Sequence, residues 1–346
     1  MAVSFFLTLL LSACNEDKVS HPNVFLSNGQ MPALVKDLHS TIHLVYGNGD
    51  SLFYMGSEDR ELSFSKPVLI AVLPQLAASH TRGPQIAATS AGLLVIACNQ
   101  SGNIFSYIKE DNGDWKPAGR VNDIDTVAKE NFLTLSADGD NVFAAWLDLR
   151  NGHNEIYGAR STNGGKTWEK NKQVYASPDK TVCECCKPSV VLQGSRVFIM
   201  FRNWLSGNRD LYLVQSNDAG SSFGQAQKLG TGSWTLNGCP MDGGGISVNE
   251  SGSPETIWNR KGFIYSCEPG KPEKQLGKGK NCNIESIKNK NIYTWVEDGN
   301  IIVMNMEGIK TSLGKGHNPV IKALSGKQVI CVWEDDHKIL GRLVDI

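Results

Sequence analysis

The sequence has almost no excess of charge of either sign. Its 346 residues include 34 basic and 35 acidic side chains, for a formal net charge of -1. A surface balanced in this way creates no large field that would attract nucleic acid or an anionic membrane face. We therefore expect no nucleic-acid partner.

Long apolar runs are also scarce, and only one stands out. The stretch from Ala2 to Ala13 is too short to cross a bilayer as a helix, but it has the length of the apolar part of an export signal. It leads into Leu11-Ser12-Ala13-Cys14, which resembles the lipobox of bacterial lipoproteins, where the cysteine thiol receives a diacylglycerol. No Lys or Arg precedes the run, so an apolar N-terminus without any processing role is the alternative.

The lipobox resemblance implies three consecutive parts. Residues 1–13 would be a removable signal peptide, and residues 14–21 would hold the lipidated Cys14 and a polar tether. Residues 22–346 would then form a single domain in the bacterial cell envelope, held to a membrane by the lipid.

Glycine is abundant, at 35 residues, and short apolar segments alternate with turns. From residue 31 onward a unit recurs, made of a short apolar strand, a second strand with a polar tip, a third apolar strand and usually a weak fourth. Second strands such as VFAAWLD from Val142 and QVICVWED from Gln328 are its clearest members. The seven units begin at Met31, Gly83, Asn131, Lys187, Gly244, Cys282 and Asn318.

The seventh unit has no fourth strand of its own after its third. The segment from Pro22 to Asn28 belongs to no other unit and can supply it. Such a strand would close a ring and remove two open sheet edges. We therefore predict an all-β fold, a β-propeller of seven four-stranded antiparallel blades closed by an N-terminal strand, with six blades or a solenoid as alternatives.

Two turns between third and fourth strands resemble the Asp box, or BNR repeat, whose pattern is Ser-x-Asp-x-Gly-x-Thr/Ser-Trp/Phe. On these motifs the chain is similar to the sialidase-like, BNR-repeat superfamily. The resemblance implies a propeller in which these turns are structural, with side-chain oxygens accepting backbone N–H groups and glycine at positive φ. The matching residues are Ser161, Asn163, Gly165 and Trp168 in one turn and Ser216, Asp218, Gly220 and Phe223 in the other.

The same resemblance implies a glycosidase site, but its residues are not carried over. Family sialidases have an Arg-Ile-Pro segment, an arginine triad for the sialic carboxylate, an acid/base Asp and a Tyr/Glu nucleophile pair. No Arg-Ile-Pro occurs in this sequence. A pair such as Asp148 and Asp242 is the candidate for acid and base if the protein is a hydrolase.

In a propeller, the loops that enter the innermost strands and the loops between second and third strands open on one face, where binding residues are expected. Several cysteines fall on these loops, and we weigh three interpretations for them. They are disulfides between neighbouring entry loops, a thiolate site for Cu or Zn, or free redox thiols. The residues are Cys183, Cys185, Cys186, Cys239 and Cys282.

Arginines lie on the same predicted loops. They either converge on an anionic ligand, because a guanidinium fits a carboxylate in two parallel hydrogen bonds, or pair with neighbouring carboxylates to hold the loops in place. The ligand-binding candidates are Arg82, Arg150, Arg202, Arg209 and Asp210.

Three functions remain open at this point. The first is an exported lipoprotein that binds a glycan or another anionic ligand at the channel mouth of its propeller. The second is an exo-glycosidase of the sialidase type, and the third is a metal-binding or redox lipoprotein that uses its cysteines.

Overall fold

The computed structural model describes residues 21–57, 62–110 and 113–346, so the expected signal segment and Cys14 lie outside the described residues. Regular structure in these ranges is all strand. In the part of the chain that the structure describes, no helix has the length and apolar character needed to cross a membrane.

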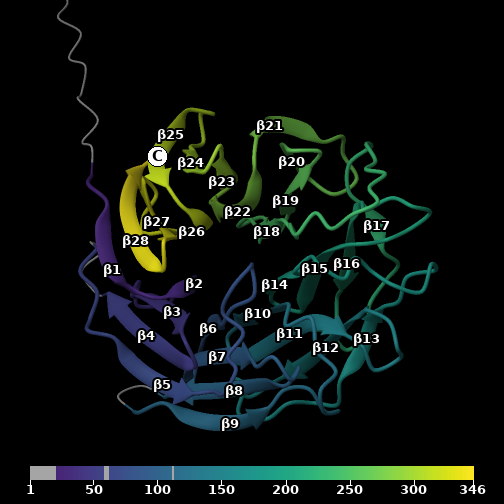
Figure 1. The fold of residues 1–346 in the computed structure, drawn as a ribbon, viewed down its shortest axis with the longest axis horizontal. Coiled ribbons are helices and arrows are strands. Elements are labelled where there is room, and N and C mark those ends of the chain that lie inside the picture. Colours follow the sequence, from purple (N-terminus) through teal and green to yellow (C-terminus); the bar gives the residue numbers. More distant parts are fainter. Residues whose placement is uncertain (1–20, 58–61, 111–112) are drawn as a thin grey trace, which may run out of the picture.

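The strands form seven four-stranded antiparallel sheets that surround one axis (Figure 1). The prediction of an all-β propeller with seven blades is confirmed, and the six-bladed and solenoid alternatives are wrong.

Blades 1 to 3 consist of β2(Gln30–Lys36), β3(Ile42–Asn48), β4(Ser51–Ser57) and β5(Val68–Val72); β6(Gln85–Thr89), β7(Gly92–Cys98), β8(Ile104–Lys109) and β9(Lys116–Arg120); and β10(Leu133–Asp138), β11(Asn141–Asp148), β12(Glu155–Ser161) and β13(Lys172–Tyr175). Blades 4 to 6 consist of β14(Ser189–Gln193), β15(Arg196–Arg202), β16(Leu211–Ser216) and β17(Gln227–Lys228); β18(Gly245–Val248), β19(Pro254–Arg260), β20(Phe263–Cys267) and β21(Lys274–Lys278); and β22(Lys280–Ile287), β23(Lys290–Glu297), β24(Asn300–Met304) and β25(Lys310–Lys315).

The seventh blade joins the two ends of the described chain. It consists of β26(His317–Ala323), β27(Gln328–Asp335), β28(Lys338–Asp345) and β1(Val24–Asn28). β1 pairs with β28 on the outer edge of this blade, with Val24 opposite Gly341 and Asn28 opposite Lys338 (Figure 1). The N-terminal strand therefore closes the ring, as the sequence pattern predicted.

The core lies between neighbouring sheets and depends on the second strand of each blade. β11 and β15 are apolar on both faces because each is covered by the blade before it and the blade after it. Tryptophans fill the core at equivalent places in four of these strands and are at most 2% exposed. They are Trp146, Trp258, Trp295 and Trp333.

Polar side chains connect the innermost strands of neighbouring blades. The hydroxyls of Thr134 and Ser136 in β10 accept hydrogen bonds from the backbone N–H groups of Val190 and Leu192 in β14, at 3.2 and 2.9 Å. Ser247 in β18 accepts the N–H of Ser286 in β22 in the same way, at 3.1 Å. These bonds satisfy N–H groups that face the neighbouring blade rather than a strand partner, and so keep the wall of the channel intact.

The two turns with the Asp-box pattern are built by local hydrogen bonds. Ser216 Oγ accepts the N–H of Gly220 at 2.8 Å and donates to Asp218, and Ser161 Oγ accepts the N–H of Gly165 at 3.0 Å. Gly220 has φ +88°, and a Cβ there would lie 2.3 Å from the Phe143 ring of the preceding blade. These contacts give the turns a structural role between blades.

Candidate functional site

A cavity of about 600 Å³ lies on the propeller axis. Its wall includes residues from the first strand of every blade, β2, β6, β10, β14, β18, β22 and β26, which surround the centre of the ring in Figure 1. The volume lies in the range of small-molecule binding sites in proteins. Residues far apart in the sequence therefore share one opening.

Lys187 is one of the charged groups of this wall. It lies at the entrance of β14, and its Nζ donates to Gln85 Oε1 of the second blade at 3.1 Å. Burial lowers the pKa of Lys187 to about 8, and no carboxylate contributes to that shift. In contrast, Lys322 in the same wall pairs with Glu285 at 2.8 Å. Among the described residues, the hydrogen-bond acceptor of the Lys187 ammonium is thus a neutral amide.

The sequence prediction did not include Lys187, although a signal for it exists. Several units enter their first strand through a residue followed by proline, namely Met31-Pro32, Gly83-Pro84, Lys187-Pro188 and Asn318-Pro319. Lysine occurs at this position only in the fourth unit.

Asp242 also reaches the cavity, but its carboxylate is engaged with the backbone. It accepts the N–H groups of Asn281 at 2.8 Å and Gly244 at 3.2 Å, and it is 4% exposed. Burial raises the pKa of Asp242, against the opposing effect of the Arg202 charge. Asp242 thus orders the entry to β18 and β22.

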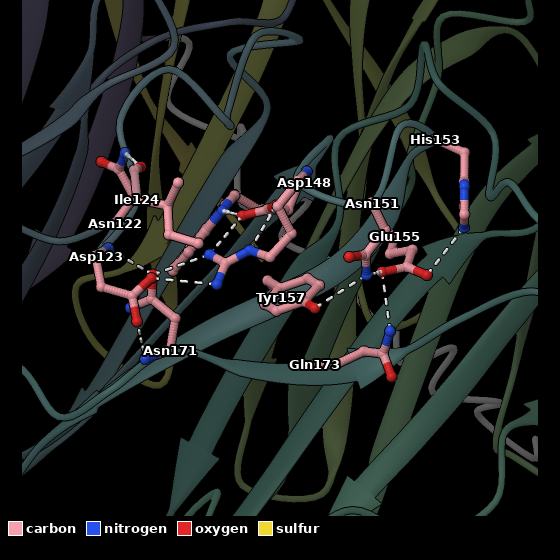
Figure 2. Close-up of polar contacts among 12 residues, drawn as sticks. Asn122, Asp123, Ile124, Asp148, Asn151, His153, Glu155, Tyr157, Asn171 and Gln173 are labelled. Carbon is pink, nitrogen blue, oxygen red and sulfur yellow. Dashed lines mark hydrogen bonds and ion pairs between the residues drawn. The ribbon is translucent and has the colours of Figure 1, made fainter.

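Asp148, the proposed catalytic partner of Asp242, lies outside this wall and is fully buried. Its carboxylate accepts Trp146 Nε1 at 2.8 Å. It also takes two parallel bonds from Arg150, from Nε and Nη2, at 2.9 Å each, which are drawn as dashed lines at Asp148 in Figure 2. Arg150 also reaches Asp123 at 3.2 Å and stacks over the Tyr157 ring. The structure therefore does not bring Asp148 and Asp242 together at one solvent-filled site.

A second carboxylate network lies beside this one. Glu155 accepts Asn151 Nδ2 at 2.7 Å and Gln173 Nε2 at 2.9 Å, and it lies 3.1 Å from His153 Nε2 (Figure 2). Because Glu155 is 3% exposed, the network ties the loop after β11 to β12 and β13.

The remaining ligand-binding candidates are also engaged within the protein. Arg202 is 1% exposed and donates to the carbonyl oxygens of Arg209, Asp242 and Asn259. Arg82 donates from Nε to the Glu130 carbonyl at 2.8 Å and stacks over the Phe132 ring. These guanidinium groups hold loops together and do not converge on the cavity.

Asp210 and Arg209 have separate partners. Asp210 accepts the N–H of Trp234 at 2.8 Å and pairs with Lys228 at 2.9 Å. Arg209 stacks over Trp204, with its Cζ 4.2 Å from the ring centre, and donates from Nη1 to Cys183 Sγ at 2.8 Å. Arg209 therefore belongs to the cysteine cluster rather than to the cavity.

Four of the five cysteines meet at one place. Cys185 and Cys239 form a disulfide between the loops that enter β14 and β18. The sulfur atoms of Cys183, Cys185 and Cys186 all lie within 4.8 Å of one another, but Cys185 is committed to the bridge, which leaves two free thiols as metal ligands. Cys282 packs instead among apolar residues of blades 5 and 6, and burial raises its pKa.

No protein-family model matches the sequence, and no curated protein matches it. Solved structures do align with it. The BP39L lectin from Burkholderia pseudomallei aligns with a TM-score of 0.66 at 10% identity, over 93% of this chain and 97% of the lectin. An ulvan lyase of polysaccharide lyase family PL25 aligns with a TM-score of 0.58 at 12% identity, over 95% of this chain and 96% of the lyase.

A sialidase is also among the similar structures. NanB from Streptococcus pneumoniae aligns with a TM-score of 0.46 at 13% identity, over 98% of this chain and 71% of the sialidase. At these identities the likeness concerns the fold alone. The chain is thus similar in architecture to a lectin and a polysaccharide lyase.

Proposed function

We propose that the protein binds an anionic glycan in its axial cavity, with Lys187 as the group that recognises a carboxylate or sulfate of the sugar. The single observation behind this proposal is that Lys187, a cation of the cavity wall, donates to a neutral amide, Gln85. A charge-assisted hydrogen bond from Lys187 to an anion would add energy that a neutral sugar cannot obtain.

Two kinds of similar structure support the ligand class. The ulvan lyase was solved bound to -[GlcA(1-4)Rha3S]-, and the SapL1 lectin, with a TM-score of 0.52 at 11% identity, was solved with alpha methyl fucoside. These ligands belong to those proteins. For this chain they favour testing saccharides first, with acidic and neutral members of the same length compared.

The lipid anchor belongs to the same proposal. The Leu11-Ser12-Ala13-Cys14 segment supports lipidation of Cys14, which would hold the propeller at the cell envelope, where extracellular or envelope glycans are within reach.

The test is binding of acidic and neutral oligosaccharides to the wild-type protein and to Lys187→Met, measured by calorimetry. Loss of one charge-assisted contact of about 1.5–3 kcal/mol lowers the affinity for the acidic sugar about tenfold or more and leaves neutral sugars unaffected. Lys274→Met, on the exposed outer strand β21, is the matched control and should bind as the wild type does. Equal affinity of Lys187→Met and wild type for acidic sugars would contradict the proposal.

The pH dependence gives an independent check. The pKa of Lys187 is lowered to about 8, so its ammonium is charged below that pH and becomes neutral above it. Affinity for the acidic sugar should therefore fall as the pH rises past about 8, whereas an exposed lysine would keep its charge to about pH 10. A flat affinity between pH 6 and 9.5 would show that Lys187 does not carry the recognition.

A further inference from the structure

The cysteine cluster lies between two loops on the entry face. Cys183, Cys185 and Cys186 belong to the loop between β13 and β14, and Cys239 belongs to the loop between β17 and β18. The Cys183 sulfur lies 3.7 Å from the sulfur of Cys185, which is bonded to Cys239, and 3.5 Å from the sulfur of Cys186. A dithiol pair is therefore in contact with a formed disulfide.

The two sides of this cluster differ in exposure. Cys183, Cys185 and Cys186 are at most 5% exposed, whereas Cys239 is exposed. The disulfide thus runs from the interior to the surface. A thiol released at Cys239 would meet solvent, and a thiol released at Cys185 would stay covered.

Arg209 supplies a positive charge beside Cys183. Its Nη1 lies 2.8 Å from Cys183 Sγ, its side chain is 6% exposed, and its buried Nε has no partner among the described residues. A buried guanidinium needs a compensating anion. The carboxylate of Glu184 is 44% exposed and reaches it only at 3.4 Å, so a thiolate on Cys183 is the closer counter-charge.

The titration of the pair agrees with this geometry. The hydrogen bond with Cys186 lowers the pKa of Cys183 to about 7 in spite of burial, and the charge of Arg209 acts in the same direction. Burial raises the pKa of Cys186. A substantial fraction of Cys183 is thus thiolate, the nucleophilic form, at neutral pH, whereas Cys186 remains a thiol.

We propose that the four cysteines form a thiol–disulfide exchange site, in which Cys183 opens the Cys185–Cys239 bond and releases a reactive thiol at the surface. The Cys183 thiolate attacks Cys185 Sγ, the Cys183–Cys185 bond forms, the Cys185–Cys239 bond breaks, and Cys239 leaves as a thiolate. The Cys186 sulfur can then attack Cys183 and move the bridge to Cys183–Cys186, its proton passing to the Cys185 thiolate. Both steps conserve electrons and need no external oxidant.

The substrate class follows from the exposure of Cys239. An accessible disulfide of a small molecule or a protein would react with the Cys239 thiolate to give a mixed disulfide and a free thiolate of the substrate. This site is separate from glycan binding and does not depend on it.

Two simpler roles fit the cluster less well. A permanent staple between the loops needs Cys185 and Cys239 alone and leaves the contact of Cys183 and Cys186 with that bridge unexplained. A metal site would have two free thiols in this state, and the buried charge of Arg209 beside Cys183 opposes a cation there. Exchange uses all four sulfur atoms and the arginine.

The experiment traps the exposed thiol. The full chain, purified without reductant or chelator, is incubated under native conditions with a bulky maleimide, quenched in acid and mapped by mass spectrometry. Cleavage after Glu184 separates Cys183 from Cys185 and Cys186, so the new bridge appears as a linked pair of peptides. We expect progressive labelling of Cys239 together with a Cys183–Cys185 or Cys183–Cys186 bridge, while the core thiols Cys98 and Cys331 stay unlabelled.

Variants and a second probe identify the attacking group. Cys183→Ser should abolish the labelling of Cys239, whereas Cys267→Ser, which removes a buried free cysteine outside the cluster, should leave it unchanged. Oxidised glutathione should form a mixed disulfide on Cys239 in the wild type and not in Cys183→Ser. If Cys183→Ser does not fold, the bridge mapped in the wild type still decides.

Several results would overturn the proposal. They are a Cys185–Cys239 bridge that persists in the wild type throughout the incubation, labelling of Cys239 at the same rate in folded Cys183→Ser, or a stoichiometric metal ion held by the unreactive Cys183 and Cys186. Labelling of Cys239 only together with Cys98 and Cys331 would report global unfolding and would also count against exchange.

Discussion

Asp148→Asn separates a structural role of this carboxylate from a catalytic one. The substitution keeps the shape of the side chain but removes the charge that faces Arg150 through two bonds of 2.9 Å, and it replaces an acceptor oxygen with an N–H₂ group opposite donors of Trp146 and Arg150. Asp148 is 0% exposed and the Arg150 side chain 11%, so water cannot replace the lost contacts at Asp148.

The expected loss of stability is large. Breaking a buried charge pair by removing one partner costs about 3–5 kcal/mol, and the remaining contact of Arg150 with Asp123 reduces this to about 2–4 kcal/mol. Because the slope of urea unfolding is about 3 kcal/mol per M for a domain of this size, the midpoint should fall by about 1 M. Asp123→Asn, which touches Arg150 through a single more exposed contact, should cost about 1 kcal/mol.

The assay is urea unfolding followed by tryptophan fluorescence, with glycan binding measured on the same samples in buffer. We expect Asp148→Asn to be less stable yet to bind acidic sugar with wild-type affinity. A variant that unfolds at the wild-type midpoint, or one that keeps its stability and loses binding or turnover, would refute the structural role. A double-mutant cycle with Arg150→Met should show a coupling energy that accounts for most of the unfolding free energy lost in Asp148→Asn.

Three other perturbations test separate features. Ser216→Ala should cost about 1–3 kcal/mol in unfolding free energy because the buried N–H of Gly220 loses its acceptor, and an effect no larger than that of the exposed Ser251→Ala would contradict this. The pKa of Glu273 is lowered to about 2, because its hydrogen bonds with backbone N–H groups and Arg260 outweigh the effect of burial. The contribution of Glu273 to folding stability is therefore present above the ordinary carboxyl pKa near 4.3 and disappears as the pH falls through about 2. Glu273→Gln should therefore lower the thermal midpoint at pH 7, with a difference that shrinks towards pH 2. Cys14→Ser should move the protein from the membrane fraction to the soluble fraction, and unchanged partitioning would exclude lipidation at Cys14.

The blades could be predicted because the relevant signal is local and repeated. Each second strand, such as Asn141–Asp148, is an apolar run with a polar tip, and burial on both faces requires that composition. The closing strand could be predicted too, since Pro22 to Asn28 had no other unit to join. Both predictions follow from counting strands rather than from knowing any contact between blades.

The site was harder to predict because the decisive partners come from loop geometry. From the sequence, Arg202 and Arg150 were equivalent candidates on the loops between second and third strands. In the structure, Arg202 donates to backbone carbonyl oxygens in the interior, whereas Arg150 donates to the carboxylate of Asp148, two residues away. Lys187 was passed over because a single lysine before a proline carries no periodic signal. Its importance depends on its contact with the neutral amide of Gln85 from the second blade, and this contact becomes apparent only when the ring is assembled.

β1, the first described strand, forms its sheet hydrogen bonds with β28, the last strand of the chain. Val24 pairs with Gly341 only after the rest of the ring has been made, so the outer edge of the last blade stays unpaired while the polypeptide is synthesised. Contacts of such sequence separation slow folding, and an unpaired strand is prone to associate with other chains during that delay. Once this pairing forms, detaching either end of the described chain must break the same sheet. One short strand pair therefore holds the ring closed.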